Sequence, residues 1–230
     1  MLYCKVVTSG EVVWDLGANT GIHSMLFSRL VGDKGTVVAF EPLEINVEEI
    51  RQTCDLNGAT NIRIVSKAIS EFSGPVEFHM GHHDKQGSLI GIGSESGVRI
   101  QVECATLDEW MNGSPLPDFV KIDIEGAESR ALRGFSRVST SFPTFAIDLH
   151  TPAEDVAVGH WLKEHGYRAF RLVDLVARTQ GISGSMVQPI QELDRGWPVR
   201  TGIWGTIIAV HPSRPEKLAT LQSLTHARAA

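Results

Sequence analysis

Hydrophobic residues recur along the chain with two different periods. Short apolar runs rich in β-branched side chains are typical of buried strands, and the segments between them have the apolar spacing of helices. The runs predict strands over residues 11–15, 36–40, 61–66, 118–123, 143–149, 167–173 and 203–210. The segments between them predict helices over residues 22–31, 43–57, 127–136 and 153–165. This alternation predicts an α/β fold whose mostly parallel sheet is covered by helices on both faces.

Two regions interrupt the alternation. Extended runs over 76–80 and 98–104 enclose a glycine-rich stretch, 81–97, which we expect to form a loop over the sheet edge. A long connection, 174–202, precedes the last strand, and connections of this length inside a domain are often functional covers. We expect this connection to lie on the substrate side of the protein.

The length and composition predict a single globular domain over 1–230, since 42% of the residues are hydrophobic and 21% are charged. We place a cofactor-binding core in 11–150 and expect 211–230 to form a tail or a loose terminal helix. The net charge of −6 argues against binding to phosphates without regard to sequence, so we expect no nucleic-acid partner.

The location of the protein is predicted from what the sequence lacks. No stretch is long and apolar enough to span a membrane, and the N-terminus lacks the pattern of a secretion signal. Cys4, Cys54 and Cys104 are far apart in the sequence and predict free thiols. We expect a cytoplasmic protein without a membrane partner, and a homodimer is compatible with these features.

The most informative motif lies between the first predicted strand and the first predicted helix. The apolar run ends at Asp15, and a turn with a glycine at each end leads into the helix. In nucleotide-binding folds such a turn brings the backbone close to the ligand. The turn residues that we expect at a cofactor are Gly17, Ala18, Asn19, Thr20 and Gly21.

Further candidates follow the next two strands. Glu41, with Pro42 after it, ends the second strand, and a carboxylate at this position can bind both hydroxyls of a ribose. Ala68 and Ile69 follow the third strand and are placed to contact an adenine, although a strand end packed into the core explains them equally well. Ser88, in the glycine-rich stretch, could reach the cofactor or the substrate. These residues predict a cofactor that contains adenosine.

The acid before the turn bears on which cofactor binds. In the dinucleotide fingerprint, backbone amides pack against a pyrophosphate, and Asp15 would repel such a group. The same carboxylate would attract the ammonium and sulfonium of S-adenosylmethionine, whose own carboxylate the turn amides could receive. The pattern favours S-adenosylmethionine. An NAD-dependent oxidoreductase and a cofactor-binding scaffold without catalysis are the alternatives.

Charged residues alternate with apolar ones at the end of the fourth predicted strand. Lys121, Asp123 and Glu125 share one face of an extended chain because side chains repeat with period two. Charges at the carboxyl edge of a parallel sheet are costly to bury unless they pair or serve a site. A structural ion pair of Lys121 with one of the acids is the alternative to a functional site.

Several motifs occur in order along the chain. They are Asp15-Leu-Gly-Ala-Asn-Thr-Gly21, Phe40-Glu-Pro42, Thr106-Leu-Asp108, Lys121-Ile-Asp-Ile-Glu-Gly-Ala-Glu128 and Ile147-Asp-Leu-His150. In content and spacing they resemble the FkbM family of S-adenosylmethionine-dependent methyltransferases. The resemblance implies a Rossmann-like class I methyltransferase fold, with a seven-stranded sheet and a reversed final strand.

The resemblance also implies the activity and the cofactor site. The implied reaction is O-methylation of a hydroxyl on a small molecule, a natural product or a glycan. The residues implied to line the cofactor site are Asp15, Gly17, Asn19, Gly21, Glu41 and Asp123.

Methyl transfer to a hydroxyl requires a base to remove its proton. His150 follows the fifth predicted strand and is the first candidate, because an imidazole titrates near neutral pH. Capping of the next helix is the alternative role for this residue. Asp123 or Glu125 could orient His150 or take its place, and Lys121 could hold either carboxylate.

The sequence contains further candidates for functional residues, for which the evidence is weaker. His79, His82 and His83 lack the spacing of a metal site, so we expect no metal. Trp197 and Trp204 flank the last strand and are candidates for a wall of the acceptor pocket, or for ordinary packing.

Overall fold

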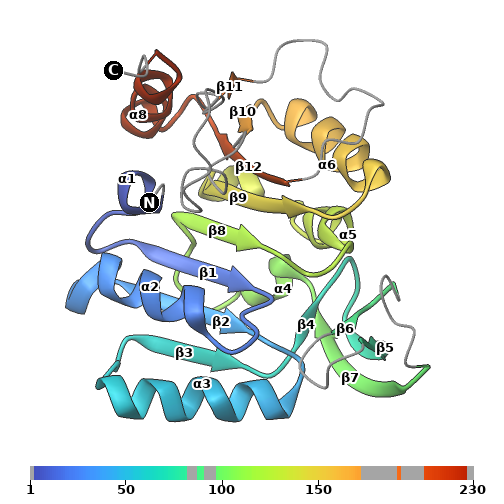
Figure 1. Cartoon of the computed structure of the whole chain (residues 1–230). Helices are drawn as coiled ribbons and strands as arrows, with labels where there is room; N and C mark the ends of the chain where they lie inside the picture. The colour runs from blue at the N-terminus through green and yellow to red at the C-terminus, as the bar shows by residue number, and fades with distance from the viewer. Residues whose placement is uncertain (1–2, 82–86, 91–96, 172–190, 193–204, 227–230) are drawn as a thin grey trace, which may run out of the picture.

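A computed structural model describes residues 3–81, 87–90, 97–171, 191–192 and 205–226, and it shows a large sheet between two layers of helices (Figure 1). The strands of this sheet are β1 (Val12–Leu16), β2 (Thr36–Phe40), β3 (Ile62–Val65), β8 (Phe119–Ile122), β9 (Thr144–Leu149), β10 (Arg168–Arg171), β11 (Gln191–Glu192) and β12 (Gly205–Val210). They lie in the order β11-β10-β12-β9-β8-β1-β2-β3.

The sheet is mostly parallel, as the sequence predicts. Among the described strands, six run in one direction, namely β1, β2, β3, β8, β9 and β10, and β12 pairs antiparallel with both β9 and β10. Although β12 is last in the sequence, it lies between β9 and β10, so the reversed strand is inside the sheet. All seven predicted strands are present, and the predicted class I methyltransferase architecture is confirmed.

The number of strands differs from the prediction, because the sheet has eight. The additional strand, β11, lies inside the connection 174–202 and pairs antiparallel with β10. It has only two residues, which is too short to give a periodic signal in the sequence. The rest of this connection, with Trp197, lies outside the described residues, and so does Trp204.

Helices cover both faces of the sheet (Figure 1). One layer contains α1 (Tyr3–Val6), α2 (Ile22–Val31), α3 (Glu44–Asn57) and α8 (Pro215–His226), and the other contains α4 (Leu107–Trp110), α5 (Glu128–Arg133) and α6 (Pro152–Glu164). Two short 3-10 turns lie at Gly32–Lys34 and Val138–Thr140.

Successive side chains of β1 face the two layers in turn. Trp14 is fully buried in a core with Leu132 of α5 and Val158 of α6, whereas Val13 packs with Phe27 of α2. Because both faces are covered, the central strands are apolar almost throughout. Charged side chains on these strands are therefore exceptional, and they lie near the carboxyl ends.

The described part of the terminal segment, 211–226, packs on the domain and is not a loose tail. Leu221 of α8 is fully buried against the α2 side of the sheet. Lys217 forms an ion pair with Glu11, and Arg214 forms one with Asp118 at 3.1 Å. The helix is fixed by these long-range contacts, which the local sequence pattern does not reveal.

A second, smaller sheet contains the two predicted extended runs. Its strands are β4 (Ala68–Ile69), β5 (Gly74–Met80), β6 (Gly87–Ser88) and β7 (Arg99–Ala105), in the order β4-β7-β5-β6. Figure 1 shows it beside the ends of β2 and β3. The stretch 81–97 was expected to be a loop, and its described part contributes the short strand β6. None of the helices within the described ranges has both the length and the hydropathy needed to cross a bilayer.

Candidate active site at the carboxyl ends of the strands

The turn after β1 is shaped by its glycines. Gly17 has a φ of 74°, and a Cβ added there would lie 2.0 Å from the backbone oxygen of Asp123, so only glycine allows this approach. The amides of Gly17 and Ala18 both donate to Phe40 O at 3.0 Å, which ties the turn to β2. Gly21 starts α2 with a φ of 83°. The turn therefore holds β1, β2 and β8 together at their carboxyl ends.

The other amides of the turn also have acceptors within the protein. Asn19 N donates to Glu41 Oε2 at 2.8 Å, Thr20 N to Asn19 Oδ1 at 2.7 Å, and Gly21 N to Ala18 O at 2.9 Å. These contacts shape the turn, and the expectation that its amides receive the carboxylate of a cofactor stays a prediction.

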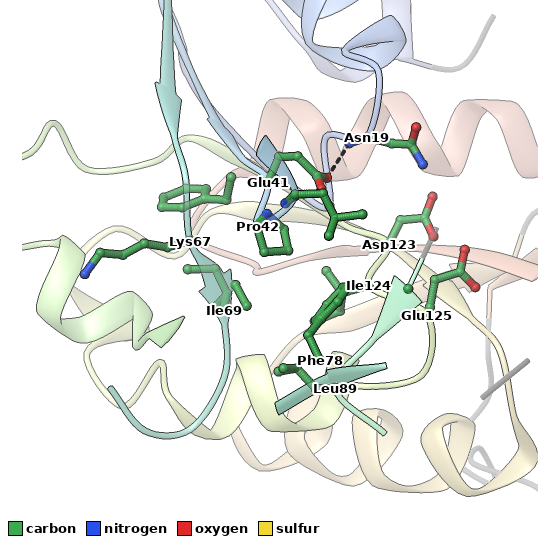
Figure 2. A pocket seen from close by; sticks show the side chains of 15 residues that line it. Asn19, Glu41, Pro42, Lys67, Ile69, Phe78, Leu89, Asp123, Ile124 and Glu125 are labelled. Atoms are coloured by element: carbon green, nitrogen blue, oxygen red, sulfur yellow. Dashed lines mark hydrogen bonds between the residues drawn. The ribbon is translucent and has the colours of Figure 1, made fainter. Parts of the chain in front are cut away.

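Glu41 connects this turn to the start of α3. Its Oε2 accepts from Asn19 N (Figure 2), and its Oε1 accepts from Leu43 N at 3.0 Å and from Asn46 Nδ2 at 3.1 Å. Only 4% of the residue is exposed. Burial raises the pKa of Glu41, and the three hydrogen bonds oppose that effect. The carboxylate is thus held in one orientation in the wall of a cavity.

The cavity encloses about 640 Å³ of space between its lining atoms, part of which is open to solvent. Figure 2 shows the apolar side chains of Ile69, Phe78 and Leu89 on one side and the carboxylates of Asp123 and Glu125 on the other. The predicted site residues that line it are Gly17, Asn19, Glu41, Pro42, Ala68, Ile69, Asp123 and Glu125. Phe78 and Leu89 were missed from the sequence, because they come from the small sheet and carry no motif.

Other predicted site residues do not line this cavity. Asp15 and Ala18 are buried beside the turn, and Thr20 faces an outer groove between α2 and α3. Gly21 packs against Ile50. Ser88 is buried next to two lining residues, and its hydroxyl has no hydrogen-bond partner among the described residues.

Lys121 is enclosed by acids below the turn. Its Nζ lies 3.1 Å from Asp15 Oδ1 and 3.6 Å from Asp123 Oδ2, and it donates to Gly17 O at 3.2 Å. Burial alone would lower the pKa of Lys121, but the two carboxylates outweigh it and raise the pKa. Ser24 Oγ donates to the other oxygen of Asp15 at 2.6 Å. The charge of Asp15 is therefore balanced inside the protein, and this was not foreseen from the sequence, which suggested pairing with Asp123 or Glu125.

His150 lies among acids from two neighbouring elements. Its Nε2 is 3.5 Å from Asp123 Oδ1 and 3.4 Å from Glu125 Oε2, and its Nδ1 is 3.1 Å from Glu128 Oε1. The hydrogen bond to Glu128 is the main reason why the pKa of His150 is raised to about 9, with further contributions from the negative charges and opposition from burial. His150 therefore carries a positive charge at neutral pH in the protein alone.

Glu128 and Asp148 belong to the site but were not assigned a role from the sequence. Glu128 is fully buried and contacts His150, and Asp148 lies two residues before His150 on β9. Burial raises the pKa of Asp148 and also that of Glu125. Both residues were present in the motifs, since Glu128 ends the segment 121–128 and Asp148 lies within 147–150.

Three side chains of this site are of types that can bind a metal ion. Asp123, Asp148 and His150 each bring one possible ligand atom within 4.8 Å of the others, and no other group of this kind occurs in the described part of the chain. Lys121 already supplies a positive charge 3.6 Å from Asp123, and we assign no metal ion. His79 lies 3.6 Å from Glu77 in β5, whereas His82 and His83 lie outside the described residues.

The residues of this site fall within a segment that matches a known family. Residues 15–169, more than half of the chain, match the methyltransferase FkbM domain. The chain belongs to the FkbM methyltransferase family. This confirms the resemblance found in the motifs, and the match extends beyond β9 to β10.

Individual relatives agree with this assignment. The chain is 26% identical over 156 residues to the hexuronic acid methyltransferase AglP of Haloferax volcanii, a match that covers 67% of this chain and 62% of AglP. The chain thus spans less than two thirds of that relative. A precorrin-6y C5,15-methyltransferase from Geobacter metallireducens has a similar fold, with a TM-score of 0.50 and 18% identity over 90% of this chain and 84% of the other. A putative rRNA methylase from Clostridium thermocellum also has a TM-score of 0.50, with 10% identity over 90% and 89% of the two chains.

Family membership decides between the two cofactors considered from the sequence. It favours S-adenosylmethionine over NAD. The geometry agrees, because Asp123 and Glu125 line the cavity where a pyrophosphate would be repelled. The two solved structures are only 18% and 10% identical to this chain, so their similarity establishes the architecture alone.

Proposed function

We propose that the protein is an S-adenosylmethionine-dependent methyltransferase that methylates a hydroxyl of a small molecule or a glycan. The single observation that carries this proposal is the shared wall of the cavity. Asp123 and Glu125 line the cavity and also lie within 3.5 Å of His150 Nε2. The cofactor cavity and a group able to take a proton thus meet at the same two acids.

The lining of the cavity fits the parts of this cofactor. Glu41 is placed to bind the ribose hydroxyls, and Ala68, Ile69 and Phe78 form an apolar surface suited to adenine. Asp123, beside the turn, offers a negative charge to the ammonium or the sulfonium. S-adenosylmethionine supplies an activated methyl group, and the protein has to align the acceptor and remove its proton.

His150 is the proposed general base, and its charge state sets a condition on catalysis. With a pKa of about 9 it must lose a proton before it can accept one from the acceptor hydroxyl. A cationic cofactor near Asp123 lowers the proton affinity of His150, because it adds positive charge to the same cluster. Asp123 and Glu125 orient Nε2 in this proposal, and Lys121 holds Asp123.

The acceptor side supports a polar, uncharged substrate. The carboxylates of Asp123, Glu125, Glu128 and Asp148 surround His150, and they would repel an acceptor that carries a negative charge. Carboxylates are good acceptors for the hydroxyls of sugars. AglP acts on a hexuronic acid; for this chain we propose a hydroxyl of a glycan or of another small molecule, with no nucleic-acid partner.

Two measurements test the proposal. Calorimetry with S-adenosylmethionine, S-adenosylhomocysteine and NAD should show binding of the first two and not of NAD. Release of S-adenosylhomocysteine is then followed with a panel of neutral sugars and other alcohols as acceptors. The proposal fails if NAD binds more tightly than S-adenosylmethionine. Tight cofactor binding without turnover on any acceptor would favour the non-catalytic scaffold.

A further inference from the structure

Glu128 is a charged residue in an unusual place. It is the first residue of α5, the helix that follows β8 and Asp123, and its side chain is fully buried. A buried carboxylate is costly unless it is hydrogen-bonded. All the hydrogen bonds recorded for Glu128 converge on one oxygen, Oε1, whereas Oε2 has no partner among the described residues.

Two of the groups on Oε1 are backbone amides. Ile124 N donates at 3.2 Å and Gly126 N at 3.0 Å. Between them, Glu125 has a φ of 55°, in the left-handed region that a side chain other than glycine rarely adopts. Glu128 therefore fixes the loop in which Ile124 and Glu125 form part of the cavity wall.

The third group is His150 Nδ1, at 3.1 Å from the same oxygen. Oε1 already accepts from two backbone N–H groups, and a proton on Nδ1 makes the contact with His150 a third hydrogen bond to the same acceptor. The neutral imidazole is thereby fixed as the Nδ1–H tautomer. Its Nε2 then holds the free lone pair, on the side of Asp123 and Glu125.

We propose that Glu128 is a positioning residue for the reaction: its Oε1 holds Nδ1–H of His150 and the cavity loop together, so that Nε2 faces the acceptor. The inference rests on the proposed role of His150 as base, and it names the group that gives this base its orientation and tautomer. In the reaction, the oxygen–methyl bond would form as the methyl–sulfur bond of S-adenosylmethionine breaks to leave S-adenosylhomocysteine, and the hydroxyl proton would pass to Nε2. Glu128 itself touches neither the cofactor nor the acceptor in this proposal.

The first test needs neither cofactor nor acceptor. In ¹⁵N-labelled protein, the ring nitrogens of His150 are observed by NMR as the pH is raised through the pKa of the ring. We expect the neutral ring to be the Nδ1–H tautomer. A neutral ring with its proton on Nε2 would overturn the inference. The measurement uses only the wild-type protein, so it does not depend on whether a variant folds.

The second test compares Glu128→Gln with a matched control, Glu154→Gln. The first substitution keeps an oxygen acceptor for the two amides but removes the charge that faces Nδ1. Glu154 accepts from Ser129 N and Ser129 Oγ at the same end of α5 and has no recorded contact with His150. We expect E128Q to lower the pKa of His150, with at least a tenfold loss of proton affinity, and E154Q to leave it unchanged.

The remaining negative charges around His150 come from Asp123, Glu125 and Asp148, and all three are present in both variants. If E128Q folds and binds S-adenosylhomocysteine but leaves the pKa and the tautomer of His150 unchanged, Glu128 has only a structural role. Failure of the proposed function gives a different result, because no acceptor would then release S-adenosylhomocysteine, whatever the NMR titration of the wild-type protein shows. If His150 is not the base, His150→Ala retains full turnover.

Discussion

Lys121 Nζ lies 3.1 Å from Asp15 Oδ1 in the middle of the sheet, and the two side chains are 5% and 0% exposed. They come from adjacent parallel strands, with Asp15 and Lys121 in direct register. Pairing across the sheet neutralises two charges that neither strand could bury alone. The same ammonium also reaches Asp123, so the ion pair fixes one wall of the cavity as well as the core.

Replacement of Lys121 by Met should strongly destabilise the fold, because it leaves Asp15 buried without a counter-charge. We expect a loss of about 3–5 kcal/mol in the free energy of unfolding, measured by urea denaturation. Arg51→Met is the control, since its ion pair with Glu44 is exposed and should contribute little. Equal effects of the two substitutions would show that the buried pair has no special role.

Gly17→Ala should disrupt both the turn and cofactor binding. The added methyl would meet Asp123 O at 2.0 Å, and the φ of 74° is unfavourable for alanine. Gly58→Ala is a matched control, because Gly58 also has a positive φ but no atom within 4 Å of an added Cβ. We expect calorimetry to show weaker S-adenosylmethionine binding only for G17A. Unchanged affinity in a folded G17A protein would place the cofactor elsewhere.

Glu41→Ala should weaken S-adenosylmethionine binding by about tenfold or more, from the loss of the proposed ribose contacts. The control is Glu44→Ala, because Glu44 lies on the exposed start of α3 and outside the cavity. Calorimetry measures both affinities, and circular dichroism checks that α3 remains formed. If E41A and E44A bind the cofactor alike, Glu41 serves only to hold Asn19 and Leu43.

The raised pKa of His150 predicts how stability depends on pH. Its pKa of about 9 in the folded protein is above the ordinary value of 6.5, so protonation stabilises the fold. This contribution is complete below about pH 6.5 and is lost as the pH rises through about 9. We expect the stability advantage of the wild-type protein over His150→Gln to shrink across this window in urea titrations. Parallel curves would show that the acids around His150 do not bind its proton.

The same proton governs turnover. His150→Ala should lower the rate of S-adenosylhomocysteine release while leaving cofactor affinity nearly unchanged, because the side chain is not part of the cavity lining. In the wild-type protein, turnover should increase as the pH is raised and His150 loses its proton. A parallel loss of affinity and turnover in H150A would instead indicate a structural role.

Much of this arrangement could be predicted from local patterns. Apolar runs gave the seven main strands, and Gly17 and Gly21 marked the turn, because a positive φ and a close approach leave few other choices. Thr106 likewise acts on its own neighbours, because its hydroxyl accepts from Glu109 N at 3.0 Å and caps α4. These features depend on neighbours in the sequence or on the backbone alone.

Only the tertiary structure decided which charges meet and which side chains complete the cavity. Asp15 pairs with Lys121, 106 positions later, and Glu128 reaches His150 across two elements. Phe78 joins the cavity because the small sheet packs beside the ends of the main strands. The sequence by itself determined the strands, the glycine turn and the edge at which the site lies, since these follow from periodicity and backbone sterics. Partners between distant residues depend on strand order and register, which no local pattern specifies.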